Sequence, residues 1–211
     1  MKFENKAVPL VVIKRLPRYY RHLGELVKEG VTRVSSGELS ARMGITASQI
    51  RQDFNCFGGF GQQGYGYNVE TLHKEIGEIL GLQRGYKTII IGAGNLGHAL
   101  ANHSNFERCG FSLIGIFDEK PELIGTEINH VPVLPVDTLE DFCRENMADI
   151  AILALPNAGV DRVVAKLVNL DIKGIWNFSY ADLNVPDHIA VENVHLSDSL
   201  MTLAYQLRKK S

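Results

Sequence analysis

The sequence predicts an α/β fold in which a helical N-terminal domain precedes a domain built on a parallel sheet. Two observations support this prediction. Between residues 8 and 82 the apolar side chains recur at helical spacing, with two turn-rich interruptions, whereas from residue 87 onward short β-branched runs alternate with helical stretches. Short, continuously apolar strands separated by helices are typical of a parallel sheet covered on both faces. The 211 residues are enough for two compact domains.

The segments also indicate where the domains begin and end. Gly81-Leu-Gln-Arg-Gly85 interrupts both patterns, so we assign residues 1–82 to the helical domain and residues 86–194 to the sheet domain. Residues 195–211 form a separate C-terminal segment. The expected strands of the sheet are the apolar runs 88–91, 112–117, 149–154, 174–178 and 189–194.

Composition and charge narrow the class of protein. Residues 1–70 hold ten Lys and Arg against six Asp and Glu, about +4, and the remainder holds twelve against eighteen, about −6, which together give the net charge of −2. A basic N-terminal part followed by an acidic remainder is typical of a nucleic-acid-binding domain attached to another domain.

The three cysteines are far apart, without the spacing of a metal site or a disulfide framework, and we expect each to be buried in a cytoplasmic protein. No run approaches the ~20 apolar residues of a membrane span, so no membrane partner is expected.

Two capping motifs in the basic part predict a pair of short helices. Ser35-x-x-Glu38 opens one helix and Thr46-x-x-Gln49 opens the next, which should run from Ala47 to about Phe54. In each motif the hydroxyl accepts the backbone N–H three residues on, while Glu or Gln reaches back to the N–H of the cap. Two short helices joined by a glycine turn predict a helix-turn-helix. The side chains expected in its core are Leu39, Ile45, Ile50 and Phe54.

The second of these helices is expected to enter the major groove of DNA. Its N-terminal side chains Ser48, Gln49, Arg51 and Gln52 would reach base edges. The following segment, residues 57–66, contains five glycines and interleaved aromatic residues, which predicts a tight hairpin. A hairpin after a helix-turn-helix is typical of the wing of a winged helix.

A glycine motif opens the sheet domain. Gly92-Ala-Gly-Asn-Leu-Gly97 follows the predicted strand 88–91 and precedes a helical stretch from His98 to about Asn105. In this Rossmann-type arrangement Gly92 permits a tight turn, Gly94 lets the backbone approach a pyrophosphate, and Gly97 lets helix and strand pack closely. Asp118, 21 residues after Gly97, would accept hydrogen bonds from the adenosine ribose and repel a 2′-phosphate. We therefore assign NAD(H) binding to Gly92, Ala93, Gly94, Asn95, Leu96, Gly97 and Asp118.

The chain has little room for catalysis. A dehydrogenase needs a substrate domain, and the two predicted domains leave no residues to build one. His73, His98, His130 and His188 stand in ordinary surface contexts, so none is a convincing proton donor. The cofactor is therefore interpreted as a signal, and the chain as a DNA-binding regulator that is not an enzyme.

Residues 195–211 are predicted to form a helix with one apolar stripe, and Arg208-Lys-Lys210 suits the negative end of its dipole. Such a stripe must be buried somewhere. It packs either on its own domain or on a second subunit, and the pattern favours neither. The stripe consists of Leu196, Leu200, Leu203, Ala204 and Leu207.

Several motifs together resemble one family, the redox-sensing transcriptional repressor Rex. They span nearly the whole chain: Arg15-Leu-Pro-Arg-Tyr-Tyr-Arg21, Gln49-Ile-Arg-Gln-Asp53, Phe57-Gly-Gly-Phe-Gly61, Gly64-Tyr-Gly-Tyr-Asn-Val69 and the glycine motif. The resemblance implies a homodimer with winged-helix and Rossmann domains and a C-terminal helix exchanged between subunits. It also implies binding to double-stranded operator DNA that NADH releases through closure of the Rossmann domains. The expected DNA-binding residues are Arg15, Thr46, Ser48, Gln49, Arg51, Gln52, Gly59, Gly61 and Gly64.

The chain departs from the family pattern at two positions. His103 and His195 stand where many relatives carry a tyrosine and an aspartate, which with the arginine matching Arg15 are thought to form a state-dependent contact. We hypothesise that the two histidines approach each other in one state and add pH sensitivity to the switch. The wing also has Gln62-Gln63 where a basic residue is common.

Two alternatives belong to other classes. One is a small NAD-dependent oxidoreductase with an N-terminal extension, which turnover of NADH with a carbonyl substrate would reveal. The other is a module that binds another nucleotide such as coenzyme A; Asp118 argues against it, and competition with NADH would decide.

Overall fold

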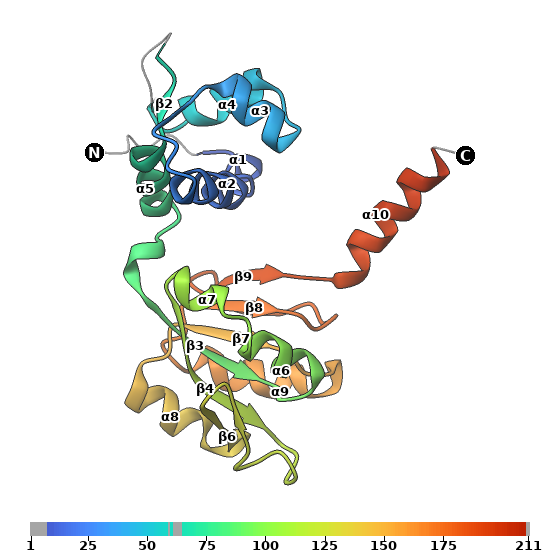
Figure 1. The fold of residues 1–211 in the computed structure, drawn as a ribbon. Coiled ribbons are helices and arrows are strands. Elements are labelled where there is room, and N and C mark those ends of the chain that lie inside the picture. Colours follow the sequence, from blue (N-terminus) through green and yellow to red (C-terminus); the bar gives the residue numbers. More distant parts are fainter. Residues whose placement is uncertain (1–7, 59, 61–64, 210–211) are drawn as a thin grey trace. The chain divides into compact units, whose positions relative to one another are not determined.

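The structure is a computed structural model that describes residues 8–58, 60 and 65–209 (Figure 1). The chain divides into two compact units, residues 1–83 and residues 84–211. No helix among the described residues is long and apolar enough to cross a membrane. Cys143 is buried as predicted, but Cys109 is only half-buried and Cys56 is exposed, so the expectation of three buried cysteines was wrong.

The first unit is a helical bundle with one short strand pair. Its core consists of the apolar sides of the longer helices, including Leu16, Leu23 and Leu26 of α2 and Ile50 and Phe54 of α4. The elements are α1 (Leu10–Ile13), α2 (Leu16–Lys28), β1 (Arg33–Val34), α3 (Ser36–Met43), α4 (Ala47–Asn55), β2 (Tyr67–Asn68) and α5 (Val69–Ile79).

Local sequence signals explain the helix-turn-helix formed by α3 and α4. Ser35 and Glu38 form the predicted reciprocal capping box, and Gly44 ends α3 in the left-handed conformation at φ +64°. Thr46 Oγ1 accepts the N–H of Gln49 at 3.1 Å. The Gln49 side chain does not reach back to the cap as predicted; its Nε2 donates to Asp53 at 2.9 Å instead. A hydrogen bond donated to a buried carboxylate is charge-assisted, so it turns the Gln49 amide towards Asp53 and away from the N–H of the cap.

The glycine-rich segment after α4 leads into β2, which pairs antiparallel with β1. Much of the predicted hairpin, including Gly59, Gly61, Gly64 and Gln62-Gln63, lies outside the described residues. Two described aromatic residues, Phe60 and Tyr67, both contact the ring of Phe54 edge-on, with centroids 5.4 Å and 5.1 Å away.

The second unit is built on a seven-stranded sheet in the order β5-β6-β4-β3-β7-β8-β9. All neighbouring strands are parallel except β5 and β6, which pair antiparallel. The predicted apolar runs form β3 (Tyr86–Ile91), β4 (Phe111–Asp118), β7 (Ile150–Leu153), β8 (Gly174–Asn177) and β9 (Ala190–Asn193); the prediction missed β5 (Glu127–Ile128) and β6 (Val131–Pro135). The parallel sheet agrees with the predicted fold class.

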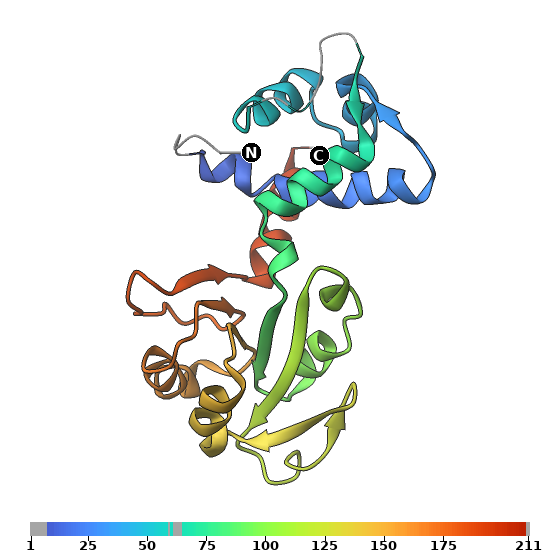
Figure 2. The same cartoon turned by 90° about the vertical axis from the view of Figure 1, so that its left-hand side faces the viewer.

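Helices cover both faces of this sheet (Figure 2). On one face α8 (Leu139–Asn146) and α9 (Asn157–Val168) pack on Ile89, Ile91 and other strand residues. On the other face, α6 (Asn95–Ala101) and α7 (Asn105–Arg108) pack over a second cluster that includes Ile90 and Ile116. Alternate residues of β3 therefore enter opposite cores, as strand geometry requires. Two 3₁₀ turns also occur, at Leu82–Arg84 and Val136–Thr138.

Two local features differ from the prediction. The stretch after the glycine motif is not one helix to about Asn105, because α6 ends at Ala101 and α7 follows separately. His73 is not an ordinary surface histidine: its ring stacks on Tyr20 with centroids 4.1 Å apart, and burial lowers its pKa.

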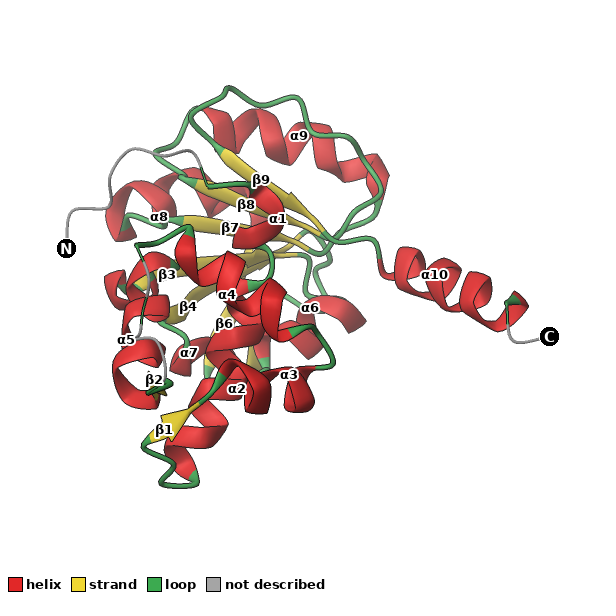
Figure 3. Cartoon of the chain, turned by 90° about the horizontal axis from the view of Figure 1, so that it is seen from above, coloured by secondary structure: helices red, strands yellow, loops and turns green. Residues whose placement is uncertain are grey.

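The C-terminal segment forms α10 (Leu196–Arg208), which follows the last strand of the sheet as a separate helix (Figure 3). None of its residues is buried. Leu196, Leu200 and Leu203 on the predicted stripe are 59%, 67% and 49% exposed, and Met201 and Tyr205 on the other side are 62% and 59% exposed. The first alternative, in which the stripe packs on its own sheet, is therefore wrong for this structure.

Candidate functional site

Two large cavities occur at opposite edges of the sheet in the second unit. A cavity of about 880 Å³ lies where the strands begin, and one of about 680 Å³ lies where β3, β4 and β7 end. Ligands of open parallel sheets bind outside the carboxyl ends of the strands, where the strand order reverses. Here that point lies at β3, between β4 and β7. The smaller cavity is therefore the candidate site.

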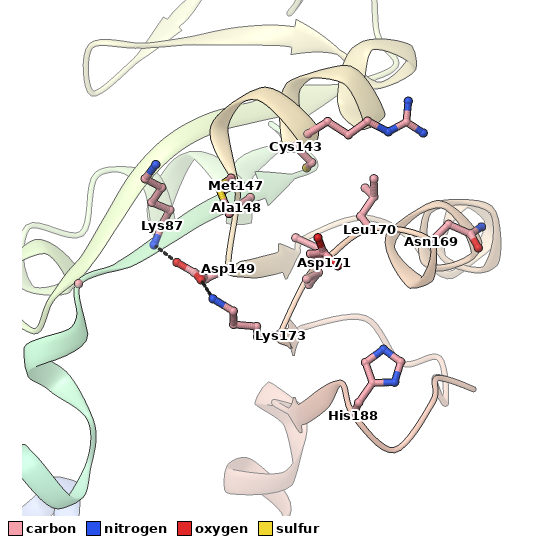
Figure 4. A pocket seen from close by; sticks show the side chains of 13 residues that line it. Lys87, Cys143, Met147, Ala148, Asp149, Asn169, Leu170, Asp171, Lys173 and His188 are labelled. Atoms are coloured by element: carbon pink, nitrogen blue, oxygen red, sulfur yellow. Dashed lines mark hydrogen bonds and ion pairs between the residues drawn. The ribbon is translucent and has the colours of Figure 1, made fainter.

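The larger cavity contains a hydrogen-bonded group of side chains around Asp149 (Figure 4). Asp149 accepts the backbone N–H of Lys87 at 2.9 Å and also the ammonium of Lys173. Burial on its own would raise the pKa of Asp149, but these hydrogen bonds hold it below its usual range. We interpret this network as a device that joins the beginnings of three strands.

The glycine motif forms the floor of the candidate site. Gly92 has φ +105°, and a Cβ there would lie 2.4 Å from the carbonyl oxygen of Ala154. A Cβ at Gly97 would lie 1.8 Å from the carbonyl oxygen of Gly92. Both positions therefore require glycine, for the turn and for the close approach of α6 to the strand. A Cβ at Gly94 would meet nothing within 4 Å, so the missing side chain there leaves open space at the entrance.

Asp118 stands at the end of β4 and holds the loops around it. Its carboxylate accepts the N–H of Ala93 at 2.6 Å and that of Lys120 at 2.9 Å, one on each oxygen. A carboxylate has about four lone-pair positions, so Asp118 keeps acceptor capacity for a hydroxyl group. Asp118 can therefore accept a ribose hydroxyl, as predicted, while it also holds the backbone at Ala93 and Lys120, a structural role that the sequence did not show.

The cavity brings together most of the predicted ligand-binding residues and several that were missed. Gly92, Gly94, Asn95, Leu96 and Asp118 line it, whereas Ala93 and Gly97 are buried behind them. Asn95, Leu96 and Gly97 form the first turn of α6, whose N–H groups have no partner within the helix. Besides the strand residues Ile91 and Phe117, the residues that sequence reasoning missed come from three other segments, and only the fold brings them here: Glu119, Lys120, Leu123, Val136, Ala154, Leu155, Pro156, Ala158, Gly159, Arg162 and Val163.

In the first unit a buried carboxylate ties α4 to α2. Asp53 is 1% exposed, and Arg15 donates to it through Nε at 2.7 Å and through Nη2 at 2.6 Å. Tyr19 donates to the same carboxylate at 2.8 Å, and Gln49 donates at 2.9 Å. Burial on its own would raise the pKa of Asp53, but the hydrogen bonds from Arg15, Tyr19 and Gln49 hold it below its usual range. The pairing of Asp53 with an arginine explains how α4 tolerates a buried acid.

Opposite its buried side, which includes Ile50 and Phe54, α4 has a face that meets solvent. Ser48, Arg51 and Gln52 are exposed, and Gln49 is half-buried. Arg51 donates to the hydroxyl of Ser36 at 3.0 Å, which holds its guanidinium near the start of α3. The exposed face of α4 is therefore polar, carries one cation and is supported from behind by the network around Asp53.

His103 and His195 have separate surroundings within the chain. The ring of His103 stacks on Phe106 with centroids 4.5 Å apart, and the ring of His195 stacks on Tyr180 with centroids 5.3 Å apart. His195 also lies 3.7 Å from a carboxylate oxygen of Asp198. The hypothesis that the two histidines approach each other in one state stays a prediction.

No group of three or more His, Cys, Asp or Glu side chains among the described residues is arranged to hold a metal ion.

Comparisons with known proteins show the family. A model described as the N-terminus of putative DNA-binding proteins matches residues 7–55, and one described as a CoA binding domain matches residues 83–181. A redox-sensing transcriptional repressor Rex from Thermoanaerobacter sp. (strain X514) is 57% identical over 203 residues, which cover 96% of this chain and 91% of that protein. The chain belongs to the Rex family. A Rex from Clostridioides difficile (strain 630) is 53% identical over 205 residues, covering 97% of this chain and 98% of that protein.

Solved structures of a Rex-family repressor called RSP have the same fold. The structure of RSP in complex with β-NAD+ and operator DNA matches with a TM-score of 0.91 at 56% identity, covering 98% of this chain and 95% of that one. The structure of RSP in complex with β-NADH matches with a TM-score of 0.88 at 53% identity, covering 98% and 97%. These matches confirm the predicted fold class and the resemblance to Rex. The names of these relatives are those of repressors, not enzymes.

Proposed function

We propose that this protein is a redox-sensing transcriptional repressor that binds operator DNA as a homodimer and is released by NADH. The observation that carries the proposal is the cleft formed by the glycine turn and Asp118, in a chain that also has a helix-turn-helix. RSP, whose fold matches along nearly the whole chain, has been solved both with β-NADH and with β-NAD+ and operator DNA. A repressor of this kind works in the cytoplasm, where the operator DNA is.

The residues of the cleft fit a dinucleotide. The open space at Gly94 lets a pyrophosphate approach the backbone, and the free N–H groups of the first turn of α6 would hold its negative charge. Asp118 would accept the adenosine ribose hydroxyls while it keeps Ala93 and Lys120 in place. When bound, the nicotinamide supplies the redox signal, since NADH and NAD+ differ by one hydride and one charge.

For the DNA contacts we propose the exposed face of α4. Ser48, Arg51 and Gln52 would reach bases or phosphates, and Gln49 would lie between them and Asp53. Thr46 at the helix N-terminus and the glycines of the wing (Gly59, Gly61 and Gly64) complete the set. The side chain of Arg15 is 27% exposed and has N–H groups beyond those that pair with Asp53. It would therefore contact a phosphate and support α4 at the same time.

The dimer is supported by the surface of α10. A helix with exposed leucines on one side and exposed Met201 and Tyr205 on the other requires apolar surroundings on both sides. A second copy of the chain would supply such surroundings if the helix inserted into it. Exchanged helices would then couple the two subunits mechanically, so that a ligand bound to one could change the geometry of the whole dimer.

A ligand acts on such a dimer only through its different affinities for the DNA-binding state and the released state. The coupling must be reciprocal. If NADH weakens operator binding by a given factor, operator DNA weakens NADH binding by the same factor.

The decisive test is a gel-shift assay on a palindromic operator from a known Rex, with NADH and NAD+ added separately. We expect release by NADH at concentrations at which NAD+ leaves the complex intact. Release by neither dinucleotide would contradict the sensor function. Coenzyme A is the control ligand, because the family model over residues 83–181 is described as CoA-binding; displacement of NADH by coenzyme A would favour that alternative. Turnover of NADH with carbonyl substrates would favour an oxidoreductase.

A further inference from the structure

An ion pair joins the two sides of the dinucleotide cleft. Glu119 follows β4 on one side, and Arg162 extends from α9 on the other. The guanidinium of Arg162 contacts the carboxylate of Glu119, and both residues line the cavity. Because Asp118 marks the adenosine end of the cleft, the neighbouring Glu119 places the pair at that end as well.

This end of the cleft already contains the cations that a phosphate needs. NADP(H) differs from NAD(H) by one phosphate group on the 2′-hydroxyl of the adenosine ribose, and arginine is the usual partner of that group. Arg162 and Lys120 both line the cavity beside Asp118. The charges of Asp118, Glu119, Lys120 and Arg162 sum to zero. Without Glu119 the same group of residues has a net charge of +1.

The two acids beside the ribose differ in what else they do. Asp118 accepts two backbone N–H groups, so its removal would also release the glycine turn at Ala93. The side chain of Glu119 is 52% exposed and that of Arg162 is 63% exposed, so their pair adds little to folding stability. Glu119 is therefore the residue whose change alters charge at the ribose while leaving the turn intact.

We propose that Glu119 is a specificity-determining residue that keeps the cleft selective for a dinucleotide without a 2′-phosphate. It does so in two ways. Its carboxylate pairs with the guanidinium of Arg162, which is then not available to a phosphate, and its negative charge repels the phosphate. This inference rests on the proposed function, since it places a dinucleotide in this cleft.

The test compares the affinities of the full-length protein for NADPH and NADH, measured by the fluorescence of the reduced nicotinamide. In Glu119→Gln we expect the Kd for NADPH to fall about tenfold, because one charge-assisted hydrogen bond is gained and one repulsion is lost. The Kd for NADH should stay within about threefold of the wild type, because NADH has no group that requires Arg162. Retained NADH binding also shows that the variant is folded.

Two control variants separate the ion pair from a general charge effect. Glu122→Gln removes the same charge three residues along, from an exposed side chain outside the cavity lining, and should leave the Kd for NADPH unchanged. The double variant Glu119→Gln/Arg162→Met should lose the gain, because the guanidinium is the phosphate ligand.

The outcomes distinguish this inference from the proposed function. If the wild type binds NADH while Glu119→Gln gains no affinity for NADPH, the inference alone is overturned. It is also overturned if Glu122→Gln gains as much, or if the gain persists without Arg162. A wild-type protein that binds neither dinucleotide overturns the proposed function and this inference together.

Discussion

Arg15 and Asp53 form a two-point pair that fastens α4 to the N-terminus of α2. The donor atoms Nε and Nη2 of Arg15 lie 2.7 Å and 2.6 Å from the two carboxylate oxygens, and the Asp53 side chain is 1% exposed. Planar, two-point pairs of this kind set geometry as well as adding energy. The position of α4 on its own domain therefore depends on a carboxylate that is almost completely buried.

Asp53→Asn should weaken operator binding without affecting NADH binding. Asparagine keeps the shape but loses the charge, so the buried pair with Arg15 is broken and stability falls by about 1–3 kcal/mol. Gel shifts, NADH titration and urea unfolding measure the three quantities. Asp182→Asn, which changes an exposed carboxylate of the other unit, is the control. Wild-type operator affinity in Asp53→Asn would show that the pair does not position α4.

The same pair predicts a pH dependence of stability. Since the pKa of Asp53 is lower in the folded state than in the unfolded chain, its contribution is fully present above the unfolded value of about 3.9 and is lost as the pH falls below it. The stability difference between wild type and Asp53→Asn should therefore be constant from pH 7 to pH 5 and shrink toward pH 3. Urea unfolding of both proteins across this range measures it, and a difference that does not shrink contradicts the assignment.

Gly97→Ala and Gly94→Ala should separate folding from ligand binding. At Gly97 the new Cβ would lie 1.8 Å from a backbone oxygen, so the turn must shift, and we expect a loss of about 3 kcal/mol of stability together with NADH binding. At Gly94 there is space and an ordinary φ of −68°, so the fold should be unchanged while NADH affinity falls. Thermal unfolding and NADH titration measure the two effects. Equal destabilisation by both variants would contradict this division.

Leu200→Asp on α10 should produce a monomer. The side chain is 67% exposed in the single chain, and a charge there would be buried without a partner in an exchanged dimer. Sedimentation velocity measures the subunit state. Thr202→Asp is the control. Thr202 lies one turn beyond Asp198 on the polar side of the helix, where its hydroxyl donates to the backbone carbonyl of Asp198, so a charge there should leave the dimer intact. A dimeric Leu200→Asp protein would show that α10 is not the helix that joins the two subunits.

The double variant His103→Ala/His195→Ala should reduce the pH dependence of NADH-induced operator release between pH 6 and pH 8. Histidine is the side chain that ordinarily changes charge in this range. Gel shifts at a fixed NADH concentration across the pH series measure it. A response unchanged from that of the wild type would refute the hypothesis that the two histidines meet.

The features that depend on local pattern were predictable. The apolar runs of β3, β4 and β7, the capping of α3 and α4, and the glycine turn follow from residues close together in the chain. β5 was missed because it has only two residues, and β6 because Pro132 and Pro135 interrupt its apolar run. The two strands are joined by a two-residue turn, Asn129-His130, with φ values of 51° and 65°. Such a turn ordinarily favours glycine at its second position, and histidine there gave no signal.

By itself the sequence determined the two domain types and the kind of ligand. The turn at Gly92 and the close approach at Gly97 can be made only by glycine, so the residue types alone reveal these backbone constraints. Only the tertiary structure decided which charges meet. Arg15 and Asp53 are 38 residues apart, and Glu119 and Arg162 come from different sides of the cleft. Pairing at such separations is set by how whole helices and strands pack, since no local pattern specifies which distant partner a side chain will reach.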